Sequence, residues 1–371
     1  MDTGNSISDF FSDLTEPRES NKRHKLIDVI TIALCAVICG ADTWEEIEEF
    51  GLAKREWFES FLELPHGIPA HDTFARIFAS MDPKEFQQAF LRWVESIQSV
   101  MKGVIAIDGK TLRRSYKKNK SPIHMVSAWA LESRMVLGQI KTGEKSNEIT
   151  AIPELLALLE LEGCIVTIDA MGCQKTIAGK IIDKGADYVL GLKGNQSTLH
   201  EEVEFFFQDC LASKFKNVAH DYHETIDGDH GRIETRRYWS ACADWLPERE
   251  EWKNISAIVM AQRECYQNGQ TTMEFRYYIT SMESNAKKIA EAVRGHWGIE
   301  NSLHWVLDIA FREDECRMRK DHAPANFAVL RHIALNLLRQ ENSKRRSIKT
   351  KRLRAGWDMD YLGKILEGSV Q

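Results

Sequence analysis

Three acidic residues lie in sequence contexts that could bring them to one place. Asp108 ends the apolar run VIAID, and Asp169 ends the similar run IVTID. Such runs predict strands buried on both faces, and functional groups of α/β proteins gather at the ends of these strands. Glu300 comes later, in a segment whose apolar residues have helical spacing. A strand-end aspartate also commonly caps the next turn, so neither aspartate is diagnostic alone.

Three carboxylates brought together would form an oxygen-rich site for one or two Mg²⁺ or Mn²⁺ ions. Two such ions, about 3.5–4 Å apart, activate a water or hydroxyl and stabilise the leaving oxygen during in-line attack on phosphorus. This chemistry fits a DNA substrate. Lys110, Arg113 and Arg114 follow Asp108 closely, and we expect them to hold the phosphate backbone beside the ions.

The helical segment around Glu300 allows other interpretations. His296 and His304 lie four residues before and after Glu300, which places all three on one face of a regular helix. That face could be an exposed polar stripe, or a zinc site made by the two histidines and the glutamate. Leu303 and Leu307 predict that much of the helix is buried, and a buried carboxylate needs a partner, a proton or a metal.

Further polar residues are weaker candidates for DNA contact. Lys193 and Asn195 follow a predicted core strand in LKGNQ, which is also a sequence typical of an ordinary turn. Three arginines alternate along a strand-like stretch and could face DNA: Arg232, Arg236 and Arg237. His220, His223 and His230 resemble a metal cluster, but DGDHG is better explained as a hairpin turn.

Composition indicates an ordinary globular protein whose net charge conceals two basic runs, each of which is on its own more typical of a solvated face than of a binding surface. The 371 residues are 43% hydrophobic and 28% charged, enough for two or three domains. The net charge is −6, yet residues 339–354 contain eight basic residues and one acid, and residues 110–120 contain six basic residues and no acid. Binding depends on such patches rather than on the total, so a nucleic-acid partner is not excluded.

The sequence favours a cytoplasmic protein with reduced cysteines. Its acidic, polar N-terminus has no pattern of a secretory signal, and its longest apolar run, residues 26–40, is too short to span a membrane. The eight cysteines include no C-x-x-C pair, and we expect Cys35 and Cys39, on an apolar helix, to lie in the core.

Periodicity predicts a helical beginning followed by a mixed α/β region. The first hundred residues form an all-helical module, with Thr43 and Pro83 at helix starts; residues 74–81 could be the recognition helix of a helix-turn-helix. Three strands then form an antiparallel meander, followed by helix, strand, helix and strand up to residue 196. Residues 197–284 interrupt this alternation with a helix and three strands, and helices return from residue 286.

Several phrases of the sequence together resemble a known family. IAIDGK, TIDAMGCQ, DYVLGLKGNQ, HGRIETR, RGHWGIENSLHWVLD and EDECRMR are similar to sequences of the H-repeat-associated transposases of Rhs elements, in the ISAs-type branch of the DDE transposases. The resemblance covers nearly the whole chain. It implies a DNA transposase with an RNase H-like core, a catalytic and metal-binding triad of Asp108, Asp169 and Glu300, and a homodimer or larger complex that joins two element ends.

The resemblance also suggests how the chain is divided. The expected parts are an N-terminal helical domain, the first part of the RNase H-like core, a β-rich insertion, a helical second part of the core, and a basic tail: residues 1–100, 101–196, 197–285, 286–342 and 343–371.

The surroundings of Glu300 depart from the pattern of many cut-and-paste relatives. Those relatives carry a Tyr seven residues before the glutamate, an Arg four before and a Lys seven after, where this chain has Val293, His296 and Leu307. His296 could replace the Arg as a phosphate ligand, and His304 could stand near the place of the missing Lys. A plain metal-dependent nuclease and an inactive DNA-binding relic of a mobile element are the alternative functions.

Overall fold

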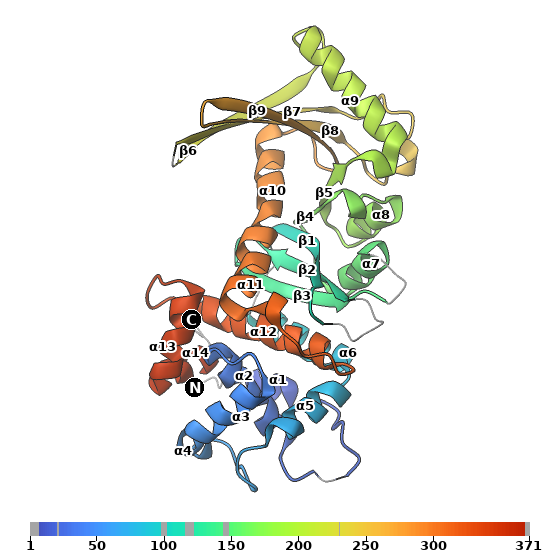
Figure 1. Ribbon diagram of the computed structural model, residues 1–371. Coiled ribbons are helices and arrows are strands. Elements are labelled where there is room, and N and C mark those ends of the chain that lie inside the picture. Colours follow the sequence, from blue (N-terminus) through green and yellow to red (C-terminus); the bar gives the residue numbers. More distant parts are fainter. Residues whose placement is uncertain are drawn as a thin grey trace, which may run out of the picture.

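The computed structural model describes residues 7–20, 22–97, 102–115, 122–143, 148–229 and 231–367. His230 and residues 116–120 of the basic run lie outside this part of the chain. The described strands form one mixed sheet in the order β3-β2-β1-β4-β5-β9-β8-β7-β6. Figure 1 shows the sheet running from the middle of the molecule to one end, with the N-terminal helices at the other end. The protein therefore has a mixed α/β fold.

The middle of the sheet contains the predicted meander and two parallel strands. The meander consists of β1 (Gly103–Leu112), β2 (Ile123–Ala130) and β3 (Met135–Lys141), which pair antiparallel. Strand β4 (Cys164–Ile168) pairs parallel with β1, and β5 (Asp187–Leu192) pairs parallel with β4. All five residues of β4 are buried, as its unbroken apolar sequence predicts.

Helices cover both faces of these strands. Helices α7 (Glu148–Leu158) and α8 (Lys175–Asp183) pack on the face that contains Ile105 and Val166, and α10 (Ala286–Gly298) packs on the face that contains Val104 and Ile165. Consecutive residues of a strand point to opposite faces, which explains why both faces of β1 and β4 are apolar. The chain after α10 continues through a π-helical segment (Ile299–His304) into α11 (Trp305–Phe311).

The β-rich segment extends the same sheet. Strands β6 (His220–Asp229), β7 (Arg232–Cys242), β8 (Ala257–Gln267) and β9 (Gln270–Thr280) are antiparallel neighbours, and β9 joins them to β5. Helix α9 (Ser197–Ala212) precedes them. The sequence predicted β7, β8 and β9 but not β6, because this edge strand leaves apolar residues such as Tyr222 and Ile226 exposed and has no clear hydrophobic alternation.

The N-terminal helices are confirmed. They are α1 (Ile7–Phe11), α2 (Leu26–Cys39), α3 (Trp44–Ala53), α4 (Arg55–Glu59), α5 (His71–Ser80) and α6 (Pro83–Ile97). Thr43 and Glu46 form a capping box at the start of α3. The candidate recognition helix α5 buries Phe74 and Phe78, and Asn326 donates a hydrogen bond of 2.8 Å to the Phe78 carbonyl. Only the short polar side of α5 is available to a partner.

The expected basic tail is folded. Helices α13 (Ile348–Trp357) and α14 (Met359–Glu367) follow the buried helix α12 (Ala323–Gln340). Lys351 Nζ donates to the Leu338 carbonyl at 2.8 Å, and an Arg352 guanidinium nitrogen donates to the Val37 carbonyl at 2.8 Å. These two cations of the expected basic tail are therefore buried and bind backbone oxygens at helix ends.

The apolar helix α2 is a core element. Ten of its residues are buried, among them Cys35, and burial raises the pKa of the Cys39 thiol to about 12. Within the described segments, no single helix is both long and apolar enough to cross a membrane. Helices α2 and α3 taken together would be long and apolar enough, but the chain bends by 96° between them. The predicted core position is confirmed for Cys35, whereas Cys39 is partly buried and packs against the same core.

Candidate active site

The register of the sheet brings two aspartates side by side. The parallel pairing of β1 with β4 ends at Ile107 and Ile168, so Asp108 and Asp169 are the next residues after the paired part of each strand. The sequence analysis placed Asp108 at the end of its strand. Strand β1 in fact continues to Leu112 against β2, with Asp108 opposite Ser127, and only its parallel pairing stops at Asp108.

Asp169 holds the turn after β4. Its Oδ1 atom accepts hydrogen bonds from the backbone N–H groups of Met171 at 3.0 Å and Gly172 at 3.4 Å, which caps the short 3₁₀ helix Ala170–Gly172. The residue is exposed and lines a cavity of about 230 Å³. The cap interpretation and the functional one are therefore compatible, because capping fixes the carboxylate at the rim of this cavity.

Glu300 reaches the same cavity from the π-helical segment. It lines the cavity with Asp169, Thr167 and His296, and its side chain is exposed. The sequence predicted a regular helix here. A π segment contains more residues per turn, is rare, and often occurs at functional sites. Spacing alone could not reveal it, because the apolar residues of Ile299–His304 fit either geometry.

Asp108 is the most perturbed of the three carboxylates. Burial, together with the nearby carboxylates of Glu148, Asp169 and Glu300, raises its pKa to about 7. The sequence analysis missed Glu148, which begins α7 and contacts His124 Nε2 through Oε1 at 2.7 Å. An acidic residue in a first helical turn is so common that its sequence context carried no signal.

Gly109 makes room for Glu148 beside β1. A Cβ atom at position 109 would lie 2.2 Å from Glu148 Oε1 and 2.4 Å from His124 Nε2, so any larger residue would displace this pair. Four carboxylates thus lie around the end of the parallel pairing.

The donor set suits a hard cation. In the described ranges, no three His, Cys, Asp or Glu side chains are grouped as a metal site in their present positions, neither as the zinc alternative nor as Asp108, Asp169 and Glu300, and His230 lies outside those ranges. Carboxylate oxygens are nevertheless the ligands that Mg²⁺ and Mn²⁺ prefer. A divalent cation would also offset the burial and the carboxylate repulsion that raise the pKa of Asp108.

The two histidines of the helix lie on either side of the acidic residues. His304 Nδ1 is 3.5 Å from Asp108 Oδ2, and burial, reinforced by the charge of Lys110, lowers the pKa of His304 to about 4. His296 Nδ1 is 3.2 Å from Thr167 Oγ1, and burial lowers its pKa too. Since His304 is neutral at pH 7 and mostly buried, it supports Asp108 rather than offering a cation to DNA.

The three basic residues after Asp108 separate into two groups. Lys110 Nζ contacts Asp308 and, at 2.8 Å, Glu313, and its side chain is only 12% exposed. Lys110 is therefore part of an internal ion-pair network rather than of a DNA-binding surface. Arg113 is 79% exposed and lies 3.2 Å from Asp314, and Arg114 is exposed as well. These two arginines remain available for phosphate contact.

The LKGNQ segment contributes Lys193 to the cavity, and two of its other side chains hold the loop after Asp169. Lys193 is exposed and lines the cavity with Asp169. Asn195 Nδ2 donates to the Ala170 carbonyl at 2.7 Å, and Gln196 Nε2 donates to the Cys173 carbonyl at 2.9 Å. Asn195 thus holds the loop that carries Asp169.

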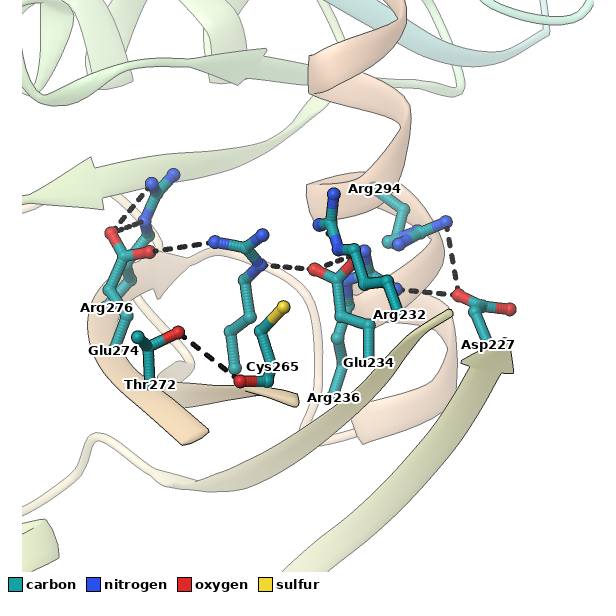
Figure 2. A network of polar contacts seen from close by, with 10 residues as sticks. Asp227, Arg232, Glu234, Arg236, Cys265, Thr272, Glu274, Arg276 and Arg294 are labelled. Carbon is teal, nitrogen blue, oxygen red and sulfur yellow. Dashed lines mark hydrogen bonds and ion pairs between the residues drawn. The ribbon is translucent and has the colours of Figure 1, made fainter. Parts of the chain in front are cut away.

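The arginines of β7 do not share one face. Arg232 and Arg236 lie on the same side as Glu234, at 2.6 Å from its oxygens, whereas Arg237 points to the other side and pairs with Glu224 and Glu264, each at 2.7 Å. Figure 2 shows the first group facing α10. Arg237 thus lies on the opposite face from Arg232 and Arg236, because neighbouring residues of a strand alternate in direction.

Comparison with known proteins agrees with these observations. A family model described as "DDE_Tnp_1-associated" matches residues 8–94, and one described as "Transposase DDE domain" matches residues 100–337. The chain is 41% identical to the "Putative transposase YncI" of Escherichia coli O157:H7, over 97% of this chain and 94% of that protein. It is 40% identical to the "H repeat-associated putative transposase YhhI" of Escherichia coli (strain K12), over 93% of each.

Solved structures were matched as well, among them the "Cryo-EM structure of piggyBac transposase synaptic complex with hairpin DNA". It is 12% identical, with a TM-score of 0.42, over 98% of this chain and 78% of that chain. The family models and the relatives along nearly the whole chain lead to one conclusion: the protein belongs to the family of transposases with a DDE domain, together with the H repeat-associated transposases.

Proposed function

We propose that this protein cuts DNA at the two ends of an insertion element and joins those ends to new DNA, in a reaction that depends on Mg²⁺ or Mn²⁺. The observation that carries the proposal is the register of β1 and β4, which sets Asp108 beside Asp169 and in electrostatic contact with Glu300. Three residues that lie far apart in the sequence, from two strands and a helical segment, meet there. Only Asp169 has a structural role as a helix cap, so capping does not explain the other two.

An RNase H-like core is part of this proposal. Its support is the strand order β3-β2-β1-β4-β5, with an antiparallel meander followed by two parallel strands and with helices on both faces. In this assignment residues 101–196 and 286–342 form the core, and residues 197–285 are an insertion that prolongs its sheet. Residues 1–100 form a helical domain beside it.

Asp108, Asp169 and Glu300 are the residues that would hold the metal ions, of which we propose two. When bound, the ions supply an activated nucleophile and a stabilised leaving oxygen at phosphorus. The chain itself fixes the carboxylates: two backbone N–H groups hold Asp169, and neutral His304 lies against Asp108. Both contacts limit side-chain movement at the reacting phosphate.

The remaining residues of the site bind and orient DNA in this proposal. Lys193 lies at the cavity rim, and Arg113 and Arg114 are exposed at the far end of β1, so that phosphates on both sides of the reacting one meet a cation. His296 lines the cavity as a neutral donor or acceptor. Joining two element ends requires at least two active sites, for which a homodimer is the simplest assembly.

The test is a strand-cleavage and strand-transfer assay with the full chain. The donor plasmid carries a marker between the two DNA segments that flank the gene, and the reaction contains a target plasmid and Mg²⁺ or Mn²⁺. We expect joined products from the wild-type protein. Asp169→Asn keeps the cap, because asparagine caps as well as aspartate. Its loss of a metal ligand is expected to lower joining by more than about 100-fold.

The matched control is Asp183→Asn, which removes an exposed carboxylate that pairs with Lys253 at the end of α8. It is expected to join strands as the wild type does. Nicked DNA without joined products would overturn the proposal in favour of a plain nuclease. DNA binding without any metal-dependent product, on the native flanking segments, would overturn it in favour of an inactive relic.

A further inference from the structure

A second, larger hollow lies between the extended sheet and helix α10. It measures about 570 Å³ and is lined by strands β7, β8 and β9 on one side and by α10 on the other. Among its lining residues, five are arginines and two are glutamates: Arg232, Arg236, Arg263, Arg276, Arg294, Glu234 and Glu274. These lining side chains carry an excess of three positive charges, which Asp227, paired with Arg236 and Arg294, lowers to two, in a chain whose net charge is negative.

The carboxylates of the hollow are shared among several arginines. Glu234 accepts from Arg232 and Arg236 at 2.6 Å each and also contacts Arg263. Figure 2 shows the group, with Arg294 reaching from α10 toward Asp227 at 3.7 Å. Each guanidinium has five N–H donors, far more than the shared carboxylate oxygens can accept. The arginines are thus held in place while many of their donors remain for an anion.

An aromatic side chain, Trp297, lies beside these charges. The Arg276 guanidinium carbon is 4.6 Å from the centre of the Trp297 ring, and Trp297 is 37% exposed. Positively charged grooves combined with exposed aromatic rings are typical of proteins that bind single-stranded nucleic acid, whose bases stack on the rings.

The hollow adjoins the acidic cavity. Arg276, Tyr278, Val293 and Trp297 line both spaces, and the smaller space also contains Asp169 and Glu300. A strand that lies along the hollow therefore reaches the carboxylates within a few nucleotides. The hollow has the volume of a small-molecule pocket, so it fits one or two nucleotides of a single strand and not a duplex.

We propose that this hollow binds the backbone phosphates of an unpaired DNA strand and directs that strand to Asp108, Asp169 and Glu300. The assignment rests on the proposed strand-cleavage function. It gives a role to Arg263, Arg276, Arg294 and Trp297, which sequence analysis did not single out, and it separates Arg232 and Arg236 from Arg237 on the opposite face.

The test compares two neighbouring arginines of one strand. Arg236→Gln removes a cation from the hollow; Arg237→Gln removes an equally well paired cation from the other face. Each full-length variant is titrated, without divalent metal, with a fluorescent duplex that has a 3′ overhang of about ten nucleotides, and with its blunt counterpart. Dissociation constants are measured between about 50 and 200 mM salt.

Arg236→Gln is expected to weaken binding of the overhang duplex about tenfold, because a charge-assisted hydrogen bond is lost. The slope of log K against log salt is expected to become shallower by about 0.7, the value for one phosphate of a single strand. Arg237→Gln is expected to change neither quantity. Equal losses in the two variants, or an equal loss on blunt DNA, would overturn the proposal.

Glu234→Gln provides a change in the opposite direction. It removes negative charge from the hollow but keeps the size of the side chain, so we expect tighter binding of the overhang duplex, which unfolding could not produce. Weaker binding would overturn the proposal. If the binding changes occur in a protein that never joins strands, the DNA-binding role of the hollow is supported and the proposed reaction fails. If the protein joins strands but the binding changes are absent, only the role of the hollow is overturned.

Discussion

Asp108 and Lys110 are two residues apart on β1, yet they belong to opposite kinds of charge cluster. Lys110 contacts Asp308 and Glu313, and Arg331 lies 4.0 Å from Glu313, so this buried network contains its own cations. Around Asp108 the charged neighbours are carboxylates, and His304 beside it is neutral. One cluster is complete within the chain, whereas the other has unbalanced negative charge.

The pKa values of the two clusters differ accordingly. Burial alone would raise the pKa of Glu313, but Lys110 and Arg331 hold it below its usual value. Burial and like charges raise the pKa of Asp108 to about 7. Since a folded protein ordinarily pairs its buried charges, the first cluster supports the fold, and the unbalanced charge of the second is what the proposed cation site requires.

The largest effect is expected from breaking the complete cluster. Glu313→Gln leaves Lys110 and Arg331 in the core without their shared carboxylate, and we expect the free energy of unfolding to fall by about 3–5 kcal/mol. Urea denaturation measures this change. Glu315→Gln, two residues later, removes an exposed partner of Arg312 and serves as the control, with an expected change within about 0.5 kcal/mol. Equal effects of the two variants would contradict the comparison.

A smaller effect of opposite sign is expected from the incomplete cluster. Asp108→Asn removes a buried carboxylate that its neighbours repel, so the metal-free protein is expected to become more stable by about 0.5–2 kcal/mol at pH 8 while strand joining is lost. Denaturation in the presence of EDTA measures the stability. A clear destabilisation would mean that Asp108 is a structural residue.

The pH dependence of Asp108→Asn sharpens this test. The folded-state pKa of Asp108 is raised, so its ionisation destabilises the fold as pH increases from about 4 to about 7, and the cost is complete above that range. The stability gained by the variant is therefore expected at pH 8 and should vanish near pH 4. A gain that does not vary with pH would show that charge is not its cause.

The sequence predicted the residues of the acidic site better than their surroundings. Asp108 and Asp169 could be paired because two apolar strands ending in aspartate place their side chains at one sheet edge. Glu148 could not be found, since its place near Asp108 depends on the absent side chain of Gly109. The π-helical turn that carries Glu300 depends on packing and leaves no pattern in the spacing of apolar residues.

The basic residues show a similar limit of sequence interpretation. Residues 339–354 form the basic run with the most cations, but Lys351 and Arg352 are buried among helices. The arginines that line the hollow come from three strands and a helix, so no local run of basic residues in the sequence could predict it. The helices of the first hundred residues and the central strands were predictable because periodicity and caps such as Thr43 are local signals.

The central claim is that the carboxylates beside the β1–β4 pairing form a cation site, and Mn²⁺ binding tests it most directly. Titration of the full chain without DNA, followed by the electron paramagnetic resonance of free Mn²⁺, is predicted to show bound Mn²⁺ in the wild type and in Asp183→Asn. Binding is predicted to be lost or greatly weakened in Asp169→Asn. Unchanged Mn²⁺ binding by Asp169→Asn would contradict the account.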